Sequence, residues 1–136
     1  MKKLLSIMVA LSMLLALVAC SGSETLESYY AKDNNKSALD ADIQAAYDMY
    51  STTYSAIEYE VKGNEVIYTY TYIDEVPAEM GDTIKSNCDS MDDATWKQIR
   101  TSLVGNSGVK DAVTITYVYL QPSGEEVTKY SKEVTE

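Results

Sequence analysis

The sequence contains no histidine, and this absence removes several common catalytic and metal-binding chemistries at once. Ser-His-Asp and Cys-His catalysis both need an imidazole, and so do zinc sites that combine His with Cys. Cysteine is also scarce, with two residues in a chain of 136, which excludes a zinc site built from several thiolates. The length itself leaves room for one small domain and excludes a large multidomain enzyme.

Positive charge is the second scarcity. The chain has 11 Lys and Arg residues against 21 Asp and Glu residues, a net charge of -10 and a pI near 4.4. Proteins that bind the phosphate backbone concentrate Lys and Arg on one face, and the sequence has no such cluster. We therefore expect no nucleic-acid partner.

The N-terminal segment has the features of an export signal. Lys2 and Lys3 precede an uncharged run of 16 residues, 4–19, which is shorter than the roughly 20 residues that a membrane-spanning helix needs. The run ends in Leu17-Val18-Ala19-Cys20, which resembles the lipobox of bacterial lipoproteins. That resemblance implies cleavage before Cys20 and diacylation of its thiol, with palmitate-type chains. An ordinary secretory signal, or a short membrane span with a chance cysteine, is the alternative.

These features divide the chain into a signal peptide (1–19), a lipidated Cys20 with a short tether (20–23) and one domain (24–136). Two acyl chains hold a protein stably at a membrane, so membrane lipid is the expected partner of Cys20. The processed chain would carry 9 basic and 21 acidic residues, and anionic headgroups repel such a domain. We predict an exported protein anchored by lipid at the extracytoplasmic face of the cell membrane.

The spacing of apolar residues predicts three helical stretches. A short helix is expected between Glu24 and Asp33, and a second one should begin with Ser37 as its cap. A third stretch runs from Ala78 to Val104, with a bend or break expected between Asn87 and Asp93. Cys88 falls on its apolar stripe, where a small buried residue is a more common role than a reactive thiol. The two stripes contain Leu39, Ile43, Ala46 or Tyr47, Tyr50 and Tyr54, and then Met80, Ile84, Cys88, Met91, Thr95, Ile99 and Leu103.

A β-hairpin is predicted around Gly63-Asn64, which is a two-residue turn signal. The strand before it alternates apolar and charged residues from Ile57 to Lys62. Pairing Lys62 with Glu65 then places Val61 opposite Val66, Tyr59 opposite Tyr68 and Ile57 opposite Tyr70, all on one face. Because the alternation and the turn agree independently, the register is well specified.

A second hairpin is predicted from Ala112 to Val134 around Pro122 and Gly124. Pairing Leu120 with Val127 gives the more apolar of two possible registers. The predicted fold is therefore α+β, with the order helix-hairpin-helix-hairpin (αββαββ) and a four-stranded antiparallel sheet that has helices packed on one face.

The complete arrangement resembles a family of small, uncharacterised lipoproteins of Gram-positive bacteria, whose domain has no assigned function. The resemblance depends on the lipobox, the Tyr68-Thr69-Tyr70-Thr71-Tyr72 strand after the Gly-Asn turn, an acidic helix and a closing hairpin around Pro122-Ser123-Gly124-Glu125. It implies a fold and a location but no activity. The layout is also similar to the helix-hairpin repeats of beta-lactamase inhibitory proteins, as an analogy of arrangement alone.

Tyrosine is abundant, with 12 residues, and most of the tyrosines in the predicted strands fall on the helix-facing side of the sheet. Core packing explains them most simply, since Tyr can replace the absent Phe. If the helices leave one end of the sheet uncovered, the same residues form a surface for a carbohydrate or a protein partner. The candidate residues are Tyr59, Tyr68, Tyr70, Tyr72, Tyr117 and Tyr119, with Tyr130 on the same side.

The remaining polar clusters suggest no cofactor and no metal. The segment 33–37 looks superficially like a calcium loop but has Ala38 and Gln44 where Gly and a bidentate Glu are needed. Asp89, Asp92 and Asp93 lie near a predicted helix start, where carboxylates complement the helix dipole. The outer sheet face, with Glu58, Glu60, Thr69, Thr71, Thr114 and Thr116, is expected to be solvated.

The sequence therefore favours a non-catalytic binding or interaction module over an enzyme. The alternative is a carboxylate-dependent hydrolase of envelope polymers, for which the fold would have to bring two carboxylates together across a cleft.

Overall fold

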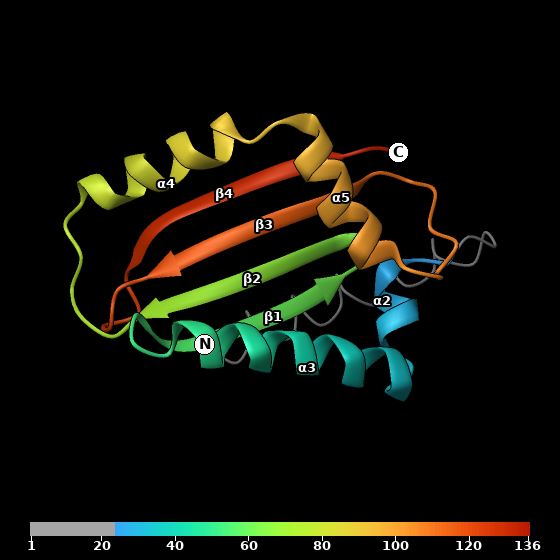
Figure 1. The fold of residues 1–136 in the computed structure, drawn as a ribbon, viewed down its shortest axis with the longest axis horizontal. Coiled ribbons are helices and arrows are strands. Elements are labelled where there is room, and N and C mark those ends of the chain that lie inside the picture. Colours follow the sequence, from blue (N-terminus) through green and yellow to red (C-terminus); the bar gives the residue numbers. More distant parts are fainter. Residues whose placement is uncertain (1–23) are drawn as a thin grey trace, which may run out of the picture.

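A computed structural model describes residues 24–136 of the chain, and the predicted export signal and Cys20 lie outside these residues. The elements follow the order α-α-β-β-α-α-β-β, in which each predicted helical unit is a pair of helices (Figure 1). Their bounds are α2 (Leu26–Tyr30), α3 (Asp33–Tyr50), β1 (Tyr54–Lys62), β2 (Glu65–Tyr72), α4 (Glu79–Ser90), α5 (Asp93–Val104), β3 (Val113–Leu120) and β4 (Glu126–Val134).

The four strands form one mixed sheet in the order β1-β2-β3-β4. Strands β1 and β2 pair antiparallel and so do β3 and β4, but the central strands β2 and β3 pair parallel. The prediction of a purely antiparallel sheet is therefore wrong. Both hairpins were placed correctly, and the error lies in how they join.

The parallel pairing follows from the connection between the hairpins. Antiparallel neighbours can be joined by a tight turn, whereas parallel neighbours need a long crossover. Helices α4 and α5 form that crossover: they lead the chain from the end of β2 back to the end of the sheet where β2 began, so β3 runs in the same direction (Figure 1). Local strand patterns contain no information on this choice.

The first hairpin has the predicted register. Val61 pairs with Val66, Tyr59 with Tyr68 and Ile57 with Tyr70. Gly63 has a φ of +57°, which suits the first central position of a two-residue turn. The strand also extends further back than predicted, because a bulge between Tyr54 and Ala56 brings Tyr54 opposite Tyr72. Tyr54, which we predicted on a helical stripe, is therefore the first residue of β1.

The second hairpin confirms the more apolar register over most of its length. Tyr119 pairs with Thr128, Tyr117 with Tyr130 and Val113 with Val134. Next to the turn, a bulge makes Leu120 pair with Glu126 in place of Val127. On the outer face, Thr116 is fully buried and its hydroxyl lies 2.7 Å from Glu65 Oε1 and 2.8 Å from Ser131 Oγ. The expectation that Thr116 is solvated is wrong, because side chains of the neighbouring strands close over it.

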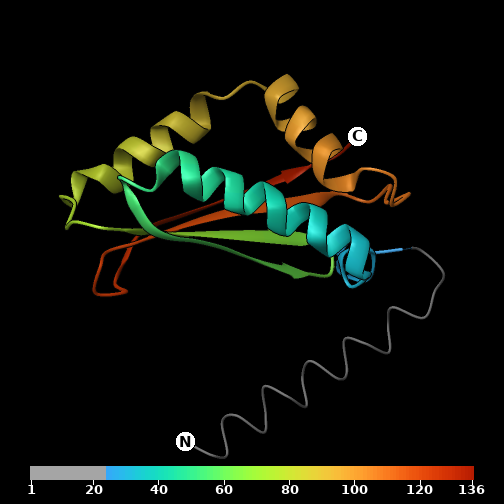
Figure 2. The ribbon, with the colours of Figure 1, turned by 60° about the horizontal axis from the view of Figure 1, so that its bottom comes forward.

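All the described helices lie on one face of the sheet (Figure 2). Helix α3 packs along the edge strand β1, and α4 packs along the other edge strand, β4. Helix α5 crosses the end of the sheet where β2 and β3 begin (Figure 1). The core gathers under α5 and contains Leu26, Val66, Ile84, Cys88, Trp96, Leu103, Val109, Val113, Ile115 and Val134.

The helix boundaries correct one sequence prediction and confirm another. Helix α3 begins at Asp33 and has Lys32, without a side-chain cap, in the capping position, so Ser37 lies inside the helix. The predicted break in the long helical stretch is confirmed, with α4 ending at Ser90 and α5 starting at Asp93. The capping residue there is Asp92, whose carboxylate accepts a hydrogen bond from Thr95 N at 2.7 Å.

Restarting the helix also changes its buried face. Trp96, Arg100 and Leu103 are the buried residues of α5, whereas Thr95, which we placed on the apolar stripe, is exposed. The Arg100 guanidinium donates to the backbone carbonyls of Val109 and Asp111 and so holds the loop that leads into β3.

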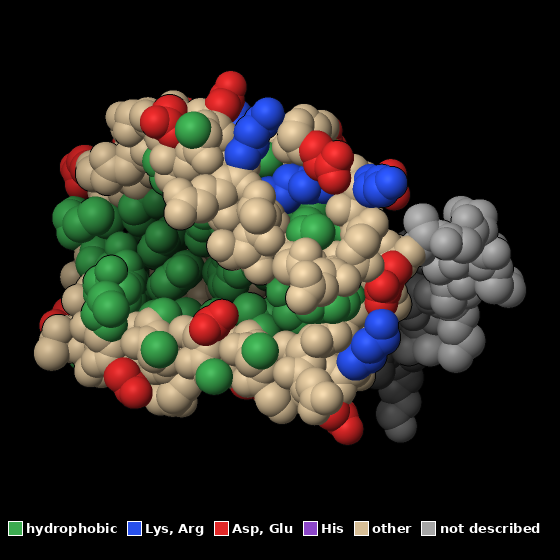
Figure 3. Space-filling view, turned by 45° about the vertical axis from the view of Figure 1, so that its right-hand side comes forward, with side chains coloured by type: hydrophobic (Ala, Val, Ile, Leu, Met, Phe, Trp, Pro, Cys, Tyr) green, Lys and Arg blue, Asp and Glu red, His purple; other side chains and the backbone are tan. Residues whose placement is uncertain are grey.

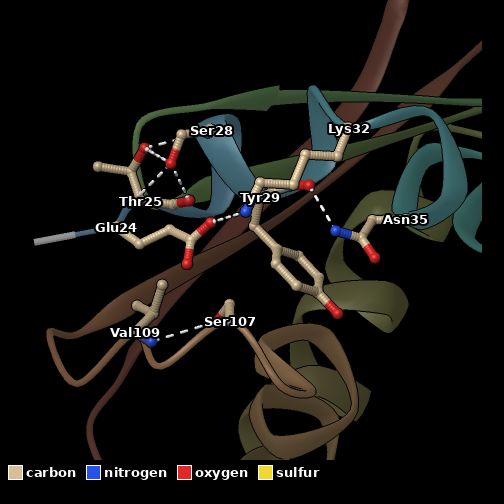
Figure 4. Close-up of polar contacts among 8 residues, drawn as sticks. All are labelled: Glu24, Thr25, Ser28, Tyr29, Lys32, Asn35, Ser107 and Val109. Atoms are coloured by element: carbon tan, nitrogen blue, oxygen red, sulfur yellow. Dashed lines mark hydrogen bonds and ion pairs between the residues drawn. The ribbon is translucent and has the colours of Figure 1, made fainter.

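Polar contacts fix the short helix α2 against its neighbours (Figure 4). Thr25 and Ser28 form a reciprocal capping box at its start, and Asn35 Nδ2 donates to the carbonyl of Tyr29 at 2.9 Å. The turn of the first hairpin joins the same region, where Leu26 N donates to Asn64 Oδ1 at 3.0 Å. Helix α2 thereby sets where α3 begins on the sheet. Within residues 24–136, no helix is both long and apolar enough to cross a membrane.

Candidate functional site

A groove runs along the helix-covered face of the sheet, above the two central strands. It exists because α3 lies against β1 and α4 lies against β4, so the floor between them is formed by β2 and β3. A space-filling view shows a hollow there, lined with hydrophobic side chains and open at one end (Figure 3). We call this feature the tyrosine groove, and its floor consists of Tyr54, Tyr68, Tyr70, Tyr72, Tyr117 and Tyr119.

The parallel pairing of β2 and β3 places these rings side by side. Tyr68 is the register partner of Tyr117, and Tyr70 is the partner of Tyr119. The rings of Tyr70 and Tyr119 stack with centroids 4.9 Å apart and planes 12° apart, and those of Tyr68 and Tyr117 stack at 5.7 Å. Tyr54 extends this layer onto β1, with its ring centroid 5.1 Å from that of Tyr72. The groove floor is therefore one continuous aromatic layer across three strands.

The two ends of the groove differ in cover. At the end crossed by α5, Trp96 is buried and lies 6.3 Å from the ring of Tyr117 and 6.0 Å from that of Tyr130. At the opposite end, Met49 is 72% exposed and Tyr50 is 49% exposed. Tyr50 contacts Tyr54 with ring centroids 6.4 Å apart, so it continues the aromatic layer to the surface. We call these the closed end and the open end.

The tyrosines of the groove floor are largely covered. Tyr72 is 7% exposed, and the other floor tyrosines are intermediate between buried and exposed. Burial, followed by the field of Tyr117, raises the pKa of Tyr70 to about 12, and burial also raises the pKa of Tyr119. These phenols stay neutral at physiological pH and can donate or accept hydrogen bonds.

Helix α3 contributes one charged residue to the groove wall. Asp42 lies three residues after the buried Leu39, on the flank of α3 opposite to Asp40. Burial raises the pKa of Tyr68 the most, the fields of neighbouring tyrosines come next, and the negative charge of Asp42 acts in the same direction with the smallest effect. Met49, seven residues further on, lies on the same flank.

A second hollow, of about 410 Å³, lies outside the groove where α2 and α3 meet the edge strand β1. Its central contact is Asp40, which accepts hydrogen bonds from Tyr59 Oη at 2.5 Å and from Lys36 Nζ at 2.6 Å. These two hydrogen bonds lower the pKa of Asp40, and the bond from Lys36 makes the larger contribution. The other carboxylates at this hollow also have partners, because Glu27 accepts from Gly63 N and Glu60 pairs with Lys62.

The structure separates the residues that the sequence suggested as a surface. Tyr68, Tyr70, Tyr72, Tyr117 and Tyr119 lie together in the groove, whereas Tyr59 lies at the outer hollow. Tyr130 is on the same face but under α5, and its hydroxyl donates to Asp89 at 3.0 Å. Cys20 lies outside the described residues.

Sequence reasoning missed three contributors to the groove: Tyr50, Tyr54 and Asp42. Tyr50 and Tyr54 were placed on the buried stripe of one helix, and the turn between them was not recognised. The sequence offered one indication of this turn, because Tyr54 lies only three residues before Ile57, where the alternating strand was predicted to begin. Asp42 gave no signal, because its position depends on where α3 lies on the sheet.

The candidate metal ligands are not brought together. Within residues 24–136, no three His, Cys, Asp or Glu side chains are close enough to hold one metal ion. The segment 33–37 forms the first turns of α3, and Asp92 and Asp93 begin α5. Cys88 is buried, and burial raises the pKa of its thiol, as expected for a core residue.

Comparison with protein families places residues 26–133 in one family, described as "Domain of unknown function (DUF4854)". Since this match covers most of the chain, the chain belongs to that family. Comparison with curated proteins and with solved structures gives no match.

Proposed function

We propose that this member of the DUF4854 family is a non-catalytic binding module that is anchored by lipid at the extracytoplasmic face of the membrane. The tyrosine groove is its binding surface, and an elongated ligand or partner segment lies along it. The observation that carries this proposal is the half-buried aromatic layer between α3 and α4, which continues to the surface in Tyr50, 49% exposed, at its open end.

The composition of the groove supports binding over packing alone. An aromatic layer that served the core alone would be fully covered, as Trp96 is at the closed end. Tyr combines a large apolar ring with a hydroxyl and loses little side-chain entropy on binding, which is why Tyr is enriched at interfaces. A carbohydrate or a polypeptide could use both properties.

The chemistry of the described side chains supports binding over hydrolysis. Hydrolysis by paired carboxylates needs two such groups facing each other with different protonation states. The carboxylates around the 410 Å³ hollow are engaged in hydrogen bonds and ion pairs, and the phenols of the groove are held neutral. We therefore do not propose the carboxylate-dependent hydrolase.

Anchoring is proposed from the sequence alone. The lipobox-like end of the signal, Leu17 to Cys20, and the low number of basic residues that could attract a membrane surface both favour a covalent anchor. Cys20→Ser should abolish incorporation of a fatty-acid probe and release the protein from membranes. Incorporation that survives this substitution would contradict the assignment of Cys20.

Site-specific cross-linking tests the groove as the binding surface. A photo-reactive phenylalanine analogue replaces Tyr50 at the open end or, as a control, Glu133 on the outer sheet face in cells that naturally produce the protein. Irradiation should give a discrete adduct from position 50 and none from position 133. The absence of an adduct at position 50, or the same adduct from both positions, would overturn the groove as the binding surface.

A further inference from the structure

The two ends of the tyrosine groove differ in charge as well as in cover. Six element ends meet at the open end: α3, β2 and β3 finish there, and β1, α4 and β4 start there (Figure 1). The parts of these elements nearest the open end, in segments 44–57, 69–84 and 117–128, contain no Lys or Arg. The described basic residues fall in segments 32–36, 62, 85–110 and 129–132, and Lys85 in α4 and Lys129 in β4 come next along the chain from the open end.

Seven carboxylates lie in the segments that meet at the open end, and two of them lie in or next to the β3–β4 connection, which projects on the side of the sheet away from the helices (Figure 2). Each of the seven is exposed, so their charges act on whatever approaches the groove. Figure 3 shows Asp and Glu side chains around the whole visible face, and its Lys and Arg side chains lie from the middle of the view to the right. The acidic residues at the open end are Asp48, Asp74, Glu75, Glu79, Asp82, Glu125 and Glu126.

An uncompensated group of like charges creates a potential that selects the sign of a ligand. At physiological ionic strength the potential of an exposed charge extends about 8 Å, so the carboxylates around one opening add to each other. On α3, the exposed Asp42 adds a negative charge on the flank opposite to Asp40, and its field reaches Tyr68. The aromatic rings themselves attract cations to their faces, so the floor and the rim favour the same ligand charge.

The shape of the groove favours a chain molecule. Small-molecule sites usually enclose most of their ligand, whereas this groove is open along its top and at one end (Figure 3). An eight-residue strand such as β2 is about 26 Å long, which matches about eight residues of extended polypeptide. The neutral phenols of Tyr70 and Tyr119 can hydrogen-bond to backbone amides of such a chain.

We propose that the tyrosine groove binds a positively charged, extended polypeptide segment. Lys or Arg side chains of the segment lie over the tyrosine rings and toward the carboxylates of the open end, and its apolar side chains fill the hollow. This inference rests on the proposed function, because it names the class of partner that the groove takes.

Three matched peptides test the sign of the charge. Eight-residue fluorescent peptides of alternating Lys and Leu, Gln and Leu, or Glu and Leu are titrated against the full chain in neutral-lipid nanodiscs. Fluorescence polarisation should show the Lys-Leu peptide binding at least tenfold more tightly than the Gln-Leu peptide. The Glu-Leu peptide should be the weakest, and added salt should weaken the Lys-Leu peptide alone.

Two charge-matched variants test the location of the site. The first neutralises the open end with Asp48→Asn, Asp74→Asn and Glu75→Gln. The second removes the same three charges elsewhere, with Glu58→Gln, Glu133→Gln and Glu136→Gln. The open-end variant should lose at least tenfold in affinity for the Lys-Leu peptide, and the control variant should stay within about twofold, because screening limits the reach of distant charges.

The outcomes separate this inference from the proposed function. Equal losses in both variants would mean general attraction to an acidic protein, and equal binding of the three peptides would mean that charge does not select the ligand. Either result, or no binding of the Lys-Leu peptide, overturns the cationic polypeptide. A discrete cross-link from position 50 would still uphold the groove as a binding surface, since that experiment does not depend on the peptides.

Discussion

The closed and open ends of the sheet are built from the same four strands and yet have opposite relations to solvent. At the closed end, Val66 and Ile115 are register partners and both are fully buried under α5. Four residues further along the same strands, Tyr70 and Tyr119 are also partners, and they form part of an open hollow. Backbone geometry is the same at both places, so the difference lies in what covers the sheet.

The choice of side chains follows this difference in cover. Where a helix excludes water, aliphatic residues give the best packing, and where water remains, Tyr tolerates half-burial because its hydroxyl stays hydrated. Along β2 the apolar face changes from the buried Val66 to the half-buried Tyr68 and Tyr70, and it ends in Tyr72, which is 7% exposed and packs against two neighbouring tyrosine rings. The aromatic residue of this layer that faces solvent is Tyr50, 49% exposed at the open end.

The largest effect on the free energy of unfolding should come from truncating a core side chain at the closed end. Leu103→Ala removes a side chain that is 5% exposed in the core under α5. We expect a loss of about 2–5 kcal/mol in the free energy of unfolding, because the cavity cannot collapse between α5 and the sheet. Denaturant unfolding followed by Trp96 fluorescence measures it. A loss below 1 kcal/mol would mean that the closed end is not the stabilising half.

The next largest effect should come from the contact between α4 and β4, which keeps the groove's second wall in place. A Cβ at Gly81 would lie 2.8 Å from the carbonyl oxygen of Val127. Gly→Ala normally stabilises a helix, but Gly81→Ala should destabilise by about 1–3 kcal/mol because the helix must move away from the strand. Ser86→Ala, at an exposed position of α4, is the control and should be neutral or slightly stabilising. Equal behaviour of the two variants would contradict the close approach.

Much of this comparison was predictable from the sequence, because the strands carry local patterns. The alternation and the Gly63-Asn64 turn predict the register of the first hairpin, and both sides of that hairpin were placed on the correct face. The helix break near Asp92 was also visible, because capping residues act within one turn.

The groove was not predictable, since it depends on long-range pairing. The stacking of Tyr70 on Tyr119 requires β2 and β3 to be parallel neighbours, and that choice is made by the crossover through α4 and α5. Residue patterns within each strand are compatible with either direction. The position of Asp42 depends in the same way on how α2 directs α3 across β1.

A smaller effect is expected at alkaline pH, and it distinguishes the half-buried phenols from free tyrosine. The pKa of Tyr70 is raised from its ordinary value of 10 to about 12, chiefly by burial. Between pH 10 and pH 12 the unfolded chain loses the Tyr70 proton and the folded chain keeps it. The contribution of the neutral phenol to the free energy of unfolding is therefore fully present below pH 10 and is lost as the pH rises toward 12. Partial exposure limits the loss to about 1 kcal/mol.

Tyr70→Phe provides the check on this pH dependence. The variant removes the ionisable group and keeps the ring, so its stability should fall less between pH 10 and pH 12 than that of the parent chain. Thermal unfolding followed by circular dichroism measures both proteins across this range. Parallel curves for the two proteins would show that the hydroxyl of Tyr70 is not protected by the groove.

The smallest effect on stability should come from the open end itself, where function and packing separate most clearly. Met49 and Tyr50 are 72% and 49% exposed, so Met49→Ala with Tyr50→Ala should change the free energy of unfolding by less than about 0.5 kcal/mol. The same double substitution should weaken the Lys-Leu peptide several-fold in the polarisation assay, because it removes the part of the aromatic layer that a ligand meets first. Ser37→Ala, an exposed position on the outer side of α3, is the control and should leave both measurements unchanged. A double variant that loses stability but keeps its affinity would assign the open end to the core and leave the groove without a function.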